Sequence, residues 1–453
     1  MSNTKTGRIF LSPPSVGAKE RAAVKRAFDS GYVAPCGPQV DEFERRLAAL
    51  AGRRYAVAVS SGTAAIDLVM AELGVDESWT VIAPTLTFIA TVGPAFHRGA
   101  RLVFVDCDET GNIDVALLEE ALESYRVDVG SHRVKVGSHR VDVGSHRVKV
   151  GSYRVDVGSH RVQVGSHRVK VGSCRGYDQT LIDPNPTLID SNPTLIDPNP
   201  TLIDSSPTLI DPNLTLNHPK TLVIGVDLYG ACCDYGAISK LCRRYGAIFV
   251  DDAAEAVGAT WNGKSAGSAG LAGIYSFNGN KIVTTSGGGA IVTDDRGLAE
   301  RAKKRAQQSR EKCAWYEHKE VGYNYRLSNI LGALGIAQLD RLPAILEKRR
   351  ANFEWYAKNF PGDVMVPPEG SNHWLTVGLL PSRRERDAMS RALAAADIES
   401  RPVWKPMHLQ PVFAGCRVFG GEVAETLFDR GICLPSGTDL SSADFRRIAG
   451  ALR

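Results

Sequence analysis

The sequence predicts an α/β protein built on a largely parallel sheet, and two observations lead to this class. Short runs of β-branched residues alternate with helical patterns, both before residue 126 and after residue 217. The alternation also resumes after residue 217 as though nothing had intervened, although a tandem repeat fills 126–217. We therefore expect one sheet formed by both halves of the chain, interrupted by a low-complexity heptapeptide-repeat insert.

The expected strands and helices follow in order along the chain. A strand at 55–59 (YAVAV) precedes SSGTAAIDLVMAELG, whose apolar residues from Ala64 onward begin a helix, and VIAPTLT and LVFVDCD add two strands. Beyond the repeat, TLVIGVDLYG, AIFVDD, GIYSF and GGAIVTDD have strand character, and ISKLCRRYG is helical. From Leu339 a long helix, LDRLPAILEKRRANFEWYAKNF, opens a mixed region. We predict a large domain at 1–125 and 218–341, an insert at 126–217 and a smaller C-terminal α/β domain at 342–453.

Two seven-residue units make up the repeat. The first, VDVGSHR with variations, occurs seven times from Val127 to Arg175, and the second, TLIDPNP, five times from Thr180 to Leu214. The Gly-Ser and paired valines of the first unit disfavour a helix and are typical of a short strand followed by a turn. Histidines spaced by seven fall on alternating faces of an extended chain, so they form no compact ligand set, and we expect no metal. A low-complexity insert is the prediction, with a small solenoid or a metal-binding array as alternatives.

The repeat stands in a connection from a helix to a strand, between VALLEEALESY and TLVIGVDL. Ligands of open α/β sheets bind at the carboxyl ends of the strands, whereas this connection leads to an amino end. Long insertions in surface loops cost little closure entropy. We therefore expect the repeat to project away from the ligand site.

Composition excludes several classes of function. The net charge of +4 in 453 residues is too small to indicate nucleic-acid binding. No run approaches 18 apolar residues, so we expect no membrane partner, and the N-terminal MSNTKTGRIF lacks the apolar core of a signal peptide. Nine cysteines without a CxxC pair are typical of free thiols in a reducing compartment. We predict a cytoplasmic protein.

Polar residues at three strand ends are the candidates for chemistry. Ser61-Gly62-Thr63 lies between a strand and a helix, where backbone N–H groups and the helix N-terminus attract an anion, although an ordinary capped turn has the same residues. Asp251-Asp252 ends the strand AIFV and faces the ligand edge, or caps a helix. Lys281 lies among small and polar residues and suits Schiff-base chemistry, though a surface lysine is the simpler alternative. Together, an anion site, a carboxylate and a lysine in this order suit pyridoxal phosphate.

At this level of detail the sequence resembles a known family, the DegT/DnrJ/EryC1/StrS sugar aminotransferases. The resemblance covers the chain from Ile9 to the C-terminus apart from 126–217, and it is carried by SSGTAAIDL, APTLTFIAT, VFVDCDETGNID, VDLYG, VDDAAEAVGA, SFNGNKIVTTSGGG and VGYNYRLSNI. It implies a fold-type I pyridoxal-phosphate enzyme. The resemblance also implies that Lys281 forms the Schiff base with the cofactor and that Asp252 pairs with its pyridinium nitrogen. Phe88 would stack on the cofactor ring, and Glu255 would lie near the ring hydroxyl.

The same resemblance implies how the phosphate is held. Gly62, Thr63 and Ser276 would bind it within the chain. Asn324 would reach the phosphate of the cofactor in a partner subunit. A homodimer with shared active sites is therefore expected.

One branch of the family is the most similar, through IFLSPPSVGAKE, SGYVAPCGPQVDEFE and SRPVWKPMHLQPVF. Its members aminate UDP-4-keto-6-deoxy-N-acetylglucosamine for glycan or exopolysaccharide synthesis, so a nucleotide sugar and an amino-acid donor, L-glutamate, are the expected partners. Four residues would then help to shape the sugar-nucleotide site, with packing of the small domain as the alternative: Trp404, Lys405, Met407 and His408.

Three other functions stay open at this point. A different nucleotide-linked keto sugar is one. A family branch that deoxygenates sugars has His at the lysine position, and Lys281 weighs against it. A third alternative is that the repeat itself is functional, as a binding module, or that it disables the enzyme. Deleting 126–217 separates these alternatives from a passenger insert, whose removal should leave the activity intact.

Overall fold

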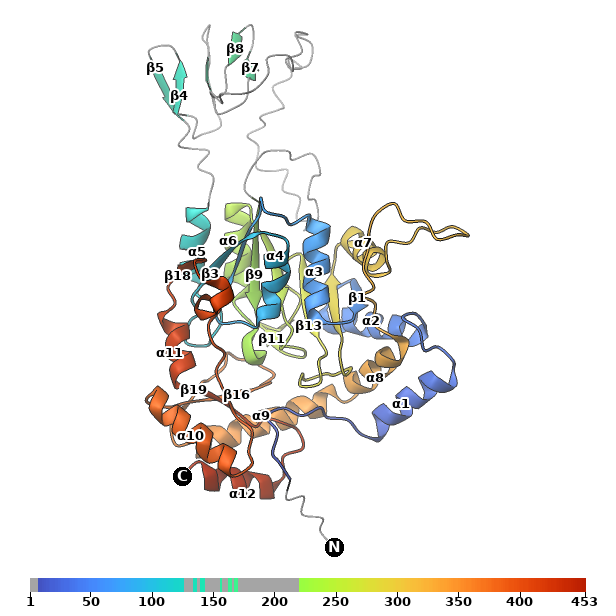
Figure 1. Ribbon diagram of the computed structural model, residues 1–453, viewed down its shortest axis with the longest axis vertical. Coiled ribbons are helices and arrows are strands. Elements are labelled where there is room, and N and C mark those ends of the chain that lie inside the picture. The colour runs from blue at the N-terminus through green and yellow to red at the C-terminus, as the bar shows by residue number, and fades with distance from the viewer. Residues whose placement is uncertain are drawn as a thin grey trace. The chain divides into compact units, whose positions relative to one another are not determined.

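The computed structural model describes residues 7–125 and 220–453, together with five short strands between residues 133 and 169 (Figure 1). The chain divides into two compact units. One comprises Met1–Tyr125 with Pro219–Arg453, and the other is Arg126–His218.

An eight-stranded sheet is the centre of the first unit, in the order β1-β14-β13-β10-β9-β2-β3-β18. Neighbouring strands from β13 to β18 are parallel, whereas β14 is antiparallel to both of its neighbours. The expected mainly parallel sheet is confirmed. The strands are β1 (Tyr55–Val59), β2 (Thr80–Pro84), β3 (Arg101–Val105), β9 (Thr221–Val226), β10 (Ile248–Asp252), β13 (Ala272–Ser276), β14 (Gly289–Thr293) and β18 (Arg417–Phe419).

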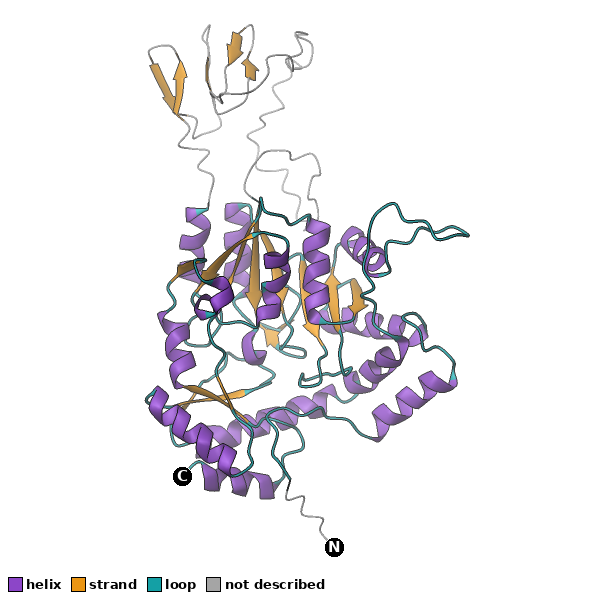
Figure 2. Cartoon of the chain, viewed as in Figure 1, coloured by secondary structure: helices purple, strands orange, loops and turns teal. Residues whose placement is uncertain are grey.

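Helices cover both faces of this sheet (Figure 2). Successive residues of a strand point to opposite faces, so Val81 and Ala83 pack into one apolar layer and Ile82 into the other. Burial on both faces explains why these strands are nearly continuous apolar runs. The helices of this region are α1 (Ala18–Asp29), α2 (Pro38–Ala51), α3 (Gly62–Leu73), α4 (Gly93–His97), α5 (Val115–Ser124), α6 (Tyr235–Tyr245), α7 (Arg296–Ala306) and α8 (Asn329–Leu339).

A second, antiparallel sheet lies in the C-terminal region, in the order β15-β16-β19-β17. Its strands are β15 (Asp363–Val364), β16 (Thr376–Leu379), β17 (Arg401–Pro402) and β19 (Gly431–Leu434). The accompanying helices are α9 (Leu342–Asn359), α10 (Arg383–Ala395), α11 (Glu422–Arg430) and α12 (Ser442–Ala451), and Tyr356, Leu393 and Ile448 are fully buried in their shared core. Minor elements are the hairpin β11 (Thr260–Trp261) and β12 (Lys264–Ser265), and the 3-10 turns Ile89–Thr91, Leu228–Gly230, Met407–Leu409 and Pro411–Phe413.

Strand β18 departs from the predicted division at 341/342. It belongs to the range assigned to the small domain, yet it pairs in parallel with β3 at the edge of the large sheet. The physical reason is that β3 would otherwise be an edge strand with unpaired backbone groups. The C-terminal segment therefore contributes to both sheets.

Short antiparallel strands occur in the first block of the repeat. β4 (Arg133–Val136) pairs with β5 (His139–Asp142) and with β6 (Val155–Asp156), and β7 (Val162–Val164) pairs with β8 (His167–Val169). These strands agree with the strand and turn expected from the Val-x-Val and Gly-Ser pattern. The second block, Thr180–Leu214, lies outside the described residues. Within the described ranges, the helices lack the length or apolar character needed to cross a membrane.

Candidate active site

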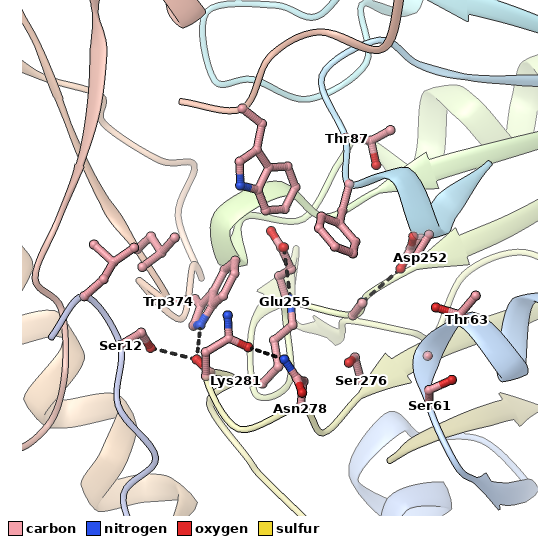
Figure 3. Close-up of a pocket in the computed structure, with 18 of the residues that line it drawn as sticks. Ser12, Ser61, Thr63, Thr87, Asp252, Glu255, Ser276, Asn278, Lys281 and Trp374 are labelled. Carbon is pink, nitrogen blue, oxygen red and sulfur yellow. Dashed lines mark hydrogen bonds and ion pairs between the residues drawn. The ribbon is translucent and has the colours of Figure 1, made fainter. Parts of the chain in front are cut away.

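A cavity of about 730 Å³ lies at the carboxyl edge of the large sheet (Figure 3). Because β1, β2, β9, β10 and β13 run in the same direction, the residues that follow them meet at this one edge. The N-terminal segment around Ser12 and the C-terminal residues Trp374 and Trp404 close the other side. The cavity is therefore built from parts of the chain that are far apart in sequence.

The turn between β1 and α3 forms one wall of the cavity. The Ser61 side chain caps α3 by accepting a hydrogen bond from the backbone N–H of Ala64, at 3.0 Å. A Cβ atom on Gly62 would lie only 3.1 Å from the Cβ of Ser276, so glycine permits the close approach of the helix start to β13. The helix N-terminus and the exposed Thr63 hydroxyl thus face the cavity, where a phosphate is favoured.

Asp252 ends β10 at the bottom of the cavity. One carboxylate oxygen accepts from the Thr91 hydroxyl at 2.7 Å and the other from the backbone N–H of Ala254 at 3.2 Å. Burial raises the pKa of Asp252, and these hydrogen bonds oppose the rise. A carboxylate in this position attracts a cationic group from the cavity side.

Lys281 and Glu255 form an ion pair in the cavity wall, with 3.1 Å between Nζ and Oε1. The Lys281 amine also lies 4.0 Å from the ring centre of Trp374. Burial raises the pKa of Glu255, while the charge of Lys281 opposes the rise. The lysine amine is therefore held in a mostly enclosed site rather than on the surface.

Aromatic side chains form the mouth of the cavity. The ring of Phe88 is 56% exposed and lies 5.6 Å from that of Trp404. Trp404 in turn contacts Tyr229 edge-on at 5.2 Å. Flat apolar surfaces of this kind can pack against rings of a cofactor or a substrate.

Eight of the twelve residues singled out in the sequence line this one cavity. They are Gly62, Thr63, Phe88, Asp252, Glu255, Ser276, Lys281 and Trp404. Asn324 is exposed and does not line the cavity of its own chain. Its expected contact with the phosphate in a partner subunit stays a prediction.

The other three predicted residues, all close to Trp404, are not among the cavity-lining residues. Met407 is buried in the apolar layer with Phe413, and its backbone N–H binds the Thr85 carbonyl. His408 Nδ1 lies 2.6 Å from the Thr85 hydroxyl, and its Nε2 lies 2.9 Å from Glu425. Lys405 does not line the cavity either. For Met407 and His408 the geometry agrees with the packing alternative.

Sequence reasoning missed Thr91, Ser12 and Trp374. Thr91 lies in a short 3-10 turn and ends the APTLTFIAT motif, but the motif by itself gave it no role, although its hydroxyl donates a hydrogen bond to Asp252. Ser12 and Trp374 both donate to the carbonyl of Asn280, each at 2.7 Å, from opposite ends of the chain. Ser12 and Thr91 lie within motifs of the family resemblance and Trp374 does not, but in all three cases only tertiary contacts show which groups they bind.

Comparison with known proteins assigns the chain to a family. The model of the DegT/DnrJ/EryC1/StrS aminotransferase family matches residues 14–131 and 187–453. The chain belongs to this family. It is a pyridoxal-phosphate-dependent sugar aminotransferase, as the sequence predicted.

Individual relatives agree with this assignment. The chain is 35% identical over 457 residues to EpsN of Bacillus subtilis, described as a pyridoxal phosphate-dependent aminotransferase, covering 98% of this chain and 95% of the relative. It is 29% identical to a GDP-perosamine synthase of Caulobacter vibrioides, covering 98% and 97%. A crystal structure of a family aminotransferase from Brucella abortus has the same fold, with a TM-score of 0.70 and 24% identity over 96% and 94% of the two chains.

The cavity fits the cofactor of the family. Its donor set comprises a lysine amine, a buried carboxylate and a helix N-terminus, and these match the aldehyde, the pyridine nitrogen and the phosphate of pyridoxal phosphate. Gly62 keeps the space beside the helix start free of a side chain.

Proposed function

We propose that this aminotransferase moves an amino group from L-glutamate to the 4-keto group of a nucleotide-linked 6-deoxy sugar, UDP-4-keto-6-deoxy-N-acetylglucosamine. The observation that carries the proposal is the convergence of Lys281, Asp252 and the Ser61–Thr63 turn on one cavity with an aromatic mouth. The first three suit the cofactor, and the mouth leaves room for a large, flat substrate.

Each of the central residues has a proposed part in the reaction. Pyridoxal phosphate, when bound, supplies the aldehyde that receives the amino group and the ring that stabilises negative charge at the reacting carbon. Lys281 would hold the cofactor covalently and, when its amine is free, would move the proton between the donor carbon and the cofactor. Asp252 keeps the ring nitrogen protonated through opposite charge in a buried site.

The remaining cofactor contacts are proposed from the family resemblance, and the residues concerned all line the cavity. Gly62, Thr63 and Ser276 hold the phosphate at the start of α3, and Phe88 stacks on the ring. Glu255 lies near the ring hydroxyl and pairs with Lys281 when that amine is free.

Trp404 is the member of the predicted substrate set that we carry forward, because it lines the mouth together with Phe88. Aromatic surfaces there suit stacking on a sugar or a nucleobase. The identity of the nucleotide has a second candidate, since one relative is named GDP-perosamine synthase and another is named as a transaminase of a UDP-linked altrosamine.

We also propose a homodimer with shared active sites. Several large apolar side chains are exposed on this chain, and an interface would cover them: Phe28, Tyr32, Val33, Trp315, Tyr316 and Val321. The exposed Asn324 lies three residues after Val321, the last of these side chains, which is consistent with Asn324 reaching a partner's phosphate site. The free cysteines among the described residues suit action in a reducing cytoplasm.

Spectroscopy of the purified chain and a panel of nucleotide sugars test this function. The wild type is expected to show the absorbance of lysine-bound cofactor, to lose it on adding glutamate, and to regain it with UDP-4-keto-6-deoxy-N-acetylglucosamine faster than with GDP- or dTDP-linked 4-keto sugars. Lys281→Ala should lack both the band and turnover. Lys264→Ala is the matched control, because this exposed lysine of β12 lies away from the cavity. Transamination that persists in Lys281→Ala would refute the assignment of the lysine.

A further inference from the structure

Trp374 contacts both ends of the Lys281 segment. Its indole face lies against the Lys281 amine, with 4.0 Å between Nζ and the ring centre. Its Nε1 donates a 2.7 Å hydrogen bond to the carbonyl of Asn280, the residue directly before Lys281. One rigid side chain therefore restrains the backbone where the lysine begins and the amine where it ends.

The indole is itself fixed in place. Trp374 is 2% exposed, its backbone N–H donates to the Asn372 side chain at 2.8 Å, and its carbonyl accepts from Arg349 at 2.8 Å. Arg349 is fully enclosed and also donates to the Ser12 hydroxyl at 3.0 Å, while that hydroxyl donates to the carbonyl of Asn280. Burial lowers the pKa of Arg349 to about 10. A tryptophan held by this many contacts offers a preformed surface rather than an adaptable one.

The Lys281 amine has two stabilising neighbours, Glu255 and Trp374. Glu255 supplies opposite charge, and the indole supplies the negative face of its ring to a cation. The side chain of Lys281 is only 13% exposed, so water cannot replace these partners fully. In the proposed reaction, each transfer of an amino group releases the Lys281 amine from its covalent bond. A free amine that must act on nearby atoms benefits from a defined position close to them.

We propose that Trp374 is a positioning residue whose indole face, together with Glu255, forms the resting place of the Lys281 amine whenever that amine carries no covalent bond. The inference rests on the proposed role of Lys281. Trp374, from the C-terminal region, would then fix both the Lys281 amine and the backbone directly before Lys281.

Chemical labelling of Lys281 tests the proposal without relying on turnover. The full chain is loaded with pyridoxamine phosphate, which has no aldehyde and leaves the lysine free, and an amine-reactive reagent is followed at Lys281 by peptide mass spectrometry. Trp374→Leu removes the face and the hydrogen bond, and Lys281 is expected to react about 3- to 30-fold faster, as the loss of a partly buried cation–π contact implies. Trp374→Phe keeps an aromatic face, and its labelling rate should stay within about threefold of the wild type. The exposed Lys25 on α1 serves as the internal standard.

Two outcomes overturn the proposal. One is a wild-type labelling rate in Trp374→Leu, and the other is an equal acceleration in Trp374→Phe and Trp374→Leu, which would assign the effect to the Nε1 hydrogen bond. If Trp374→Leu does not fold, Trp374→Met replaces it, because methionine fills irregular space without an aromatic face. Failure of the proposed function appears separately: borohydride reduction of the chain with pyridoxal phosphate would then fix the cofactor on a lysine other than Lys281.

Discussion

At the scale of single residues, Asp251 and Asp252 are neighbours with different surroundings. Successive strand residues point to opposite faces, so Asp252 lines the cavity while Asp251 points into the protein. There it lies with Asp227 and Cys233, with potential ligand atoms of all three within 4.8 Å of one another. One Asp251 oxygen accepts from the backbone N–H of Gly267 at 2.9 Å, and the other has no hydrogen-bond partner among the described residues. Burial raises the pKa of Asp251 and of Asp227, so we infer that the pair holds a proton.

Replacing Asp251 by Asn tests that inference. The folded protein keeps a proton that the unfolded chain gives up above the ordinary carboxyl pKa of about 4. The stabilisation is therefore complete below that pH and is lost as pH rises toward the raised folded pKa. Asp251→Asn carries no titrating proton, so its thermal midpoint from pH 5 to 8 should fall less than that of the wild type. Circular dichroism melts measure this, with the exposed Asp29→Asn as control; parallel curves for all three proteins would contradict it.

At the scale of elements, the close packing of β14 against the start of α3 shapes the turn that we propose for the phosphate. Gly289 begins β14, and a Cβ atom there would lie 2.4 Å from the Ser61 carbonyl carbon and 2.5 Å from the Gly62 backbone nitrogen. Backbone atoms at such distances cannot be relieved by a change of rotamer. The strand and the helix start must therefore meet through glycine.

Gly289→Ala should push the turn away from its anion-binding position. We expect roughly 5- to 150-fold weaker binding of pyridoxal phosphate and a lower thermal midpoint, since an overpacked contact costs roughly 1–3 kcal/mol. Fluorescence titration with the cofactor and thermal melts measure the two effects. Gly450→Ala on α12 is the matched control, because nothing lies within 4 Å of its added Cβ. Unchanged cofactor affinity in Gly289→Ala would show that the turn is not held by β14.

At the scale of the whole molecule, the repeat enters on the edge of the sheet opposite the cavity. It connects the end of α5 to the start of β9 at Thr221, whereas Val226 at the other end of β9 lines the cavity. The described residues that line the cavity fall within 10–91 and 226–433. The cavity and the point where the repeat joins the sheet are thus at opposite ends of β9.

Deleting 126–217 with a short Gly-Ser linker should leave kcat/KM within about twofold, because a shorter connection alters only closure entropy far from the cavity. Steady-state kinetics on the nucleotide sugar measures this. Sedimentation of the same two proteins is expected to give a dimer for both, since the exposed apolar residues proposed above for the interface, from Phe28 to Val321, are not among 126–217. Loss of activity with an intact dimer would show that the repeat takes part in function.

The local chemistry of the site was readable because it follows strand ends. Asp252 and Ser61–Thr63 stand directly after apolar strands, and the carboxyl ends of parallel strands must share one edge. The surroundings of Met407 and His408 were less predictable, because they depend on tertiary contacts: the Met407 side chain is buried in an apolar layer, and the His408 ring binds Thr85 and Glu425.

The sequence by itself determined the parallel sheet, the family and eight residues that line the cavity, because period, turn chemistry and motif spacing are local properties. The tertiary structure alone decided that β18 completes the large sheet and that Ser12 and Trp374 meet at the carbonyl of Asn280. These contacts depend on how the N- and C-terminal segments fold back onto the sheet. Such long-range closure leaves no periodic trace in the residues that achieve it.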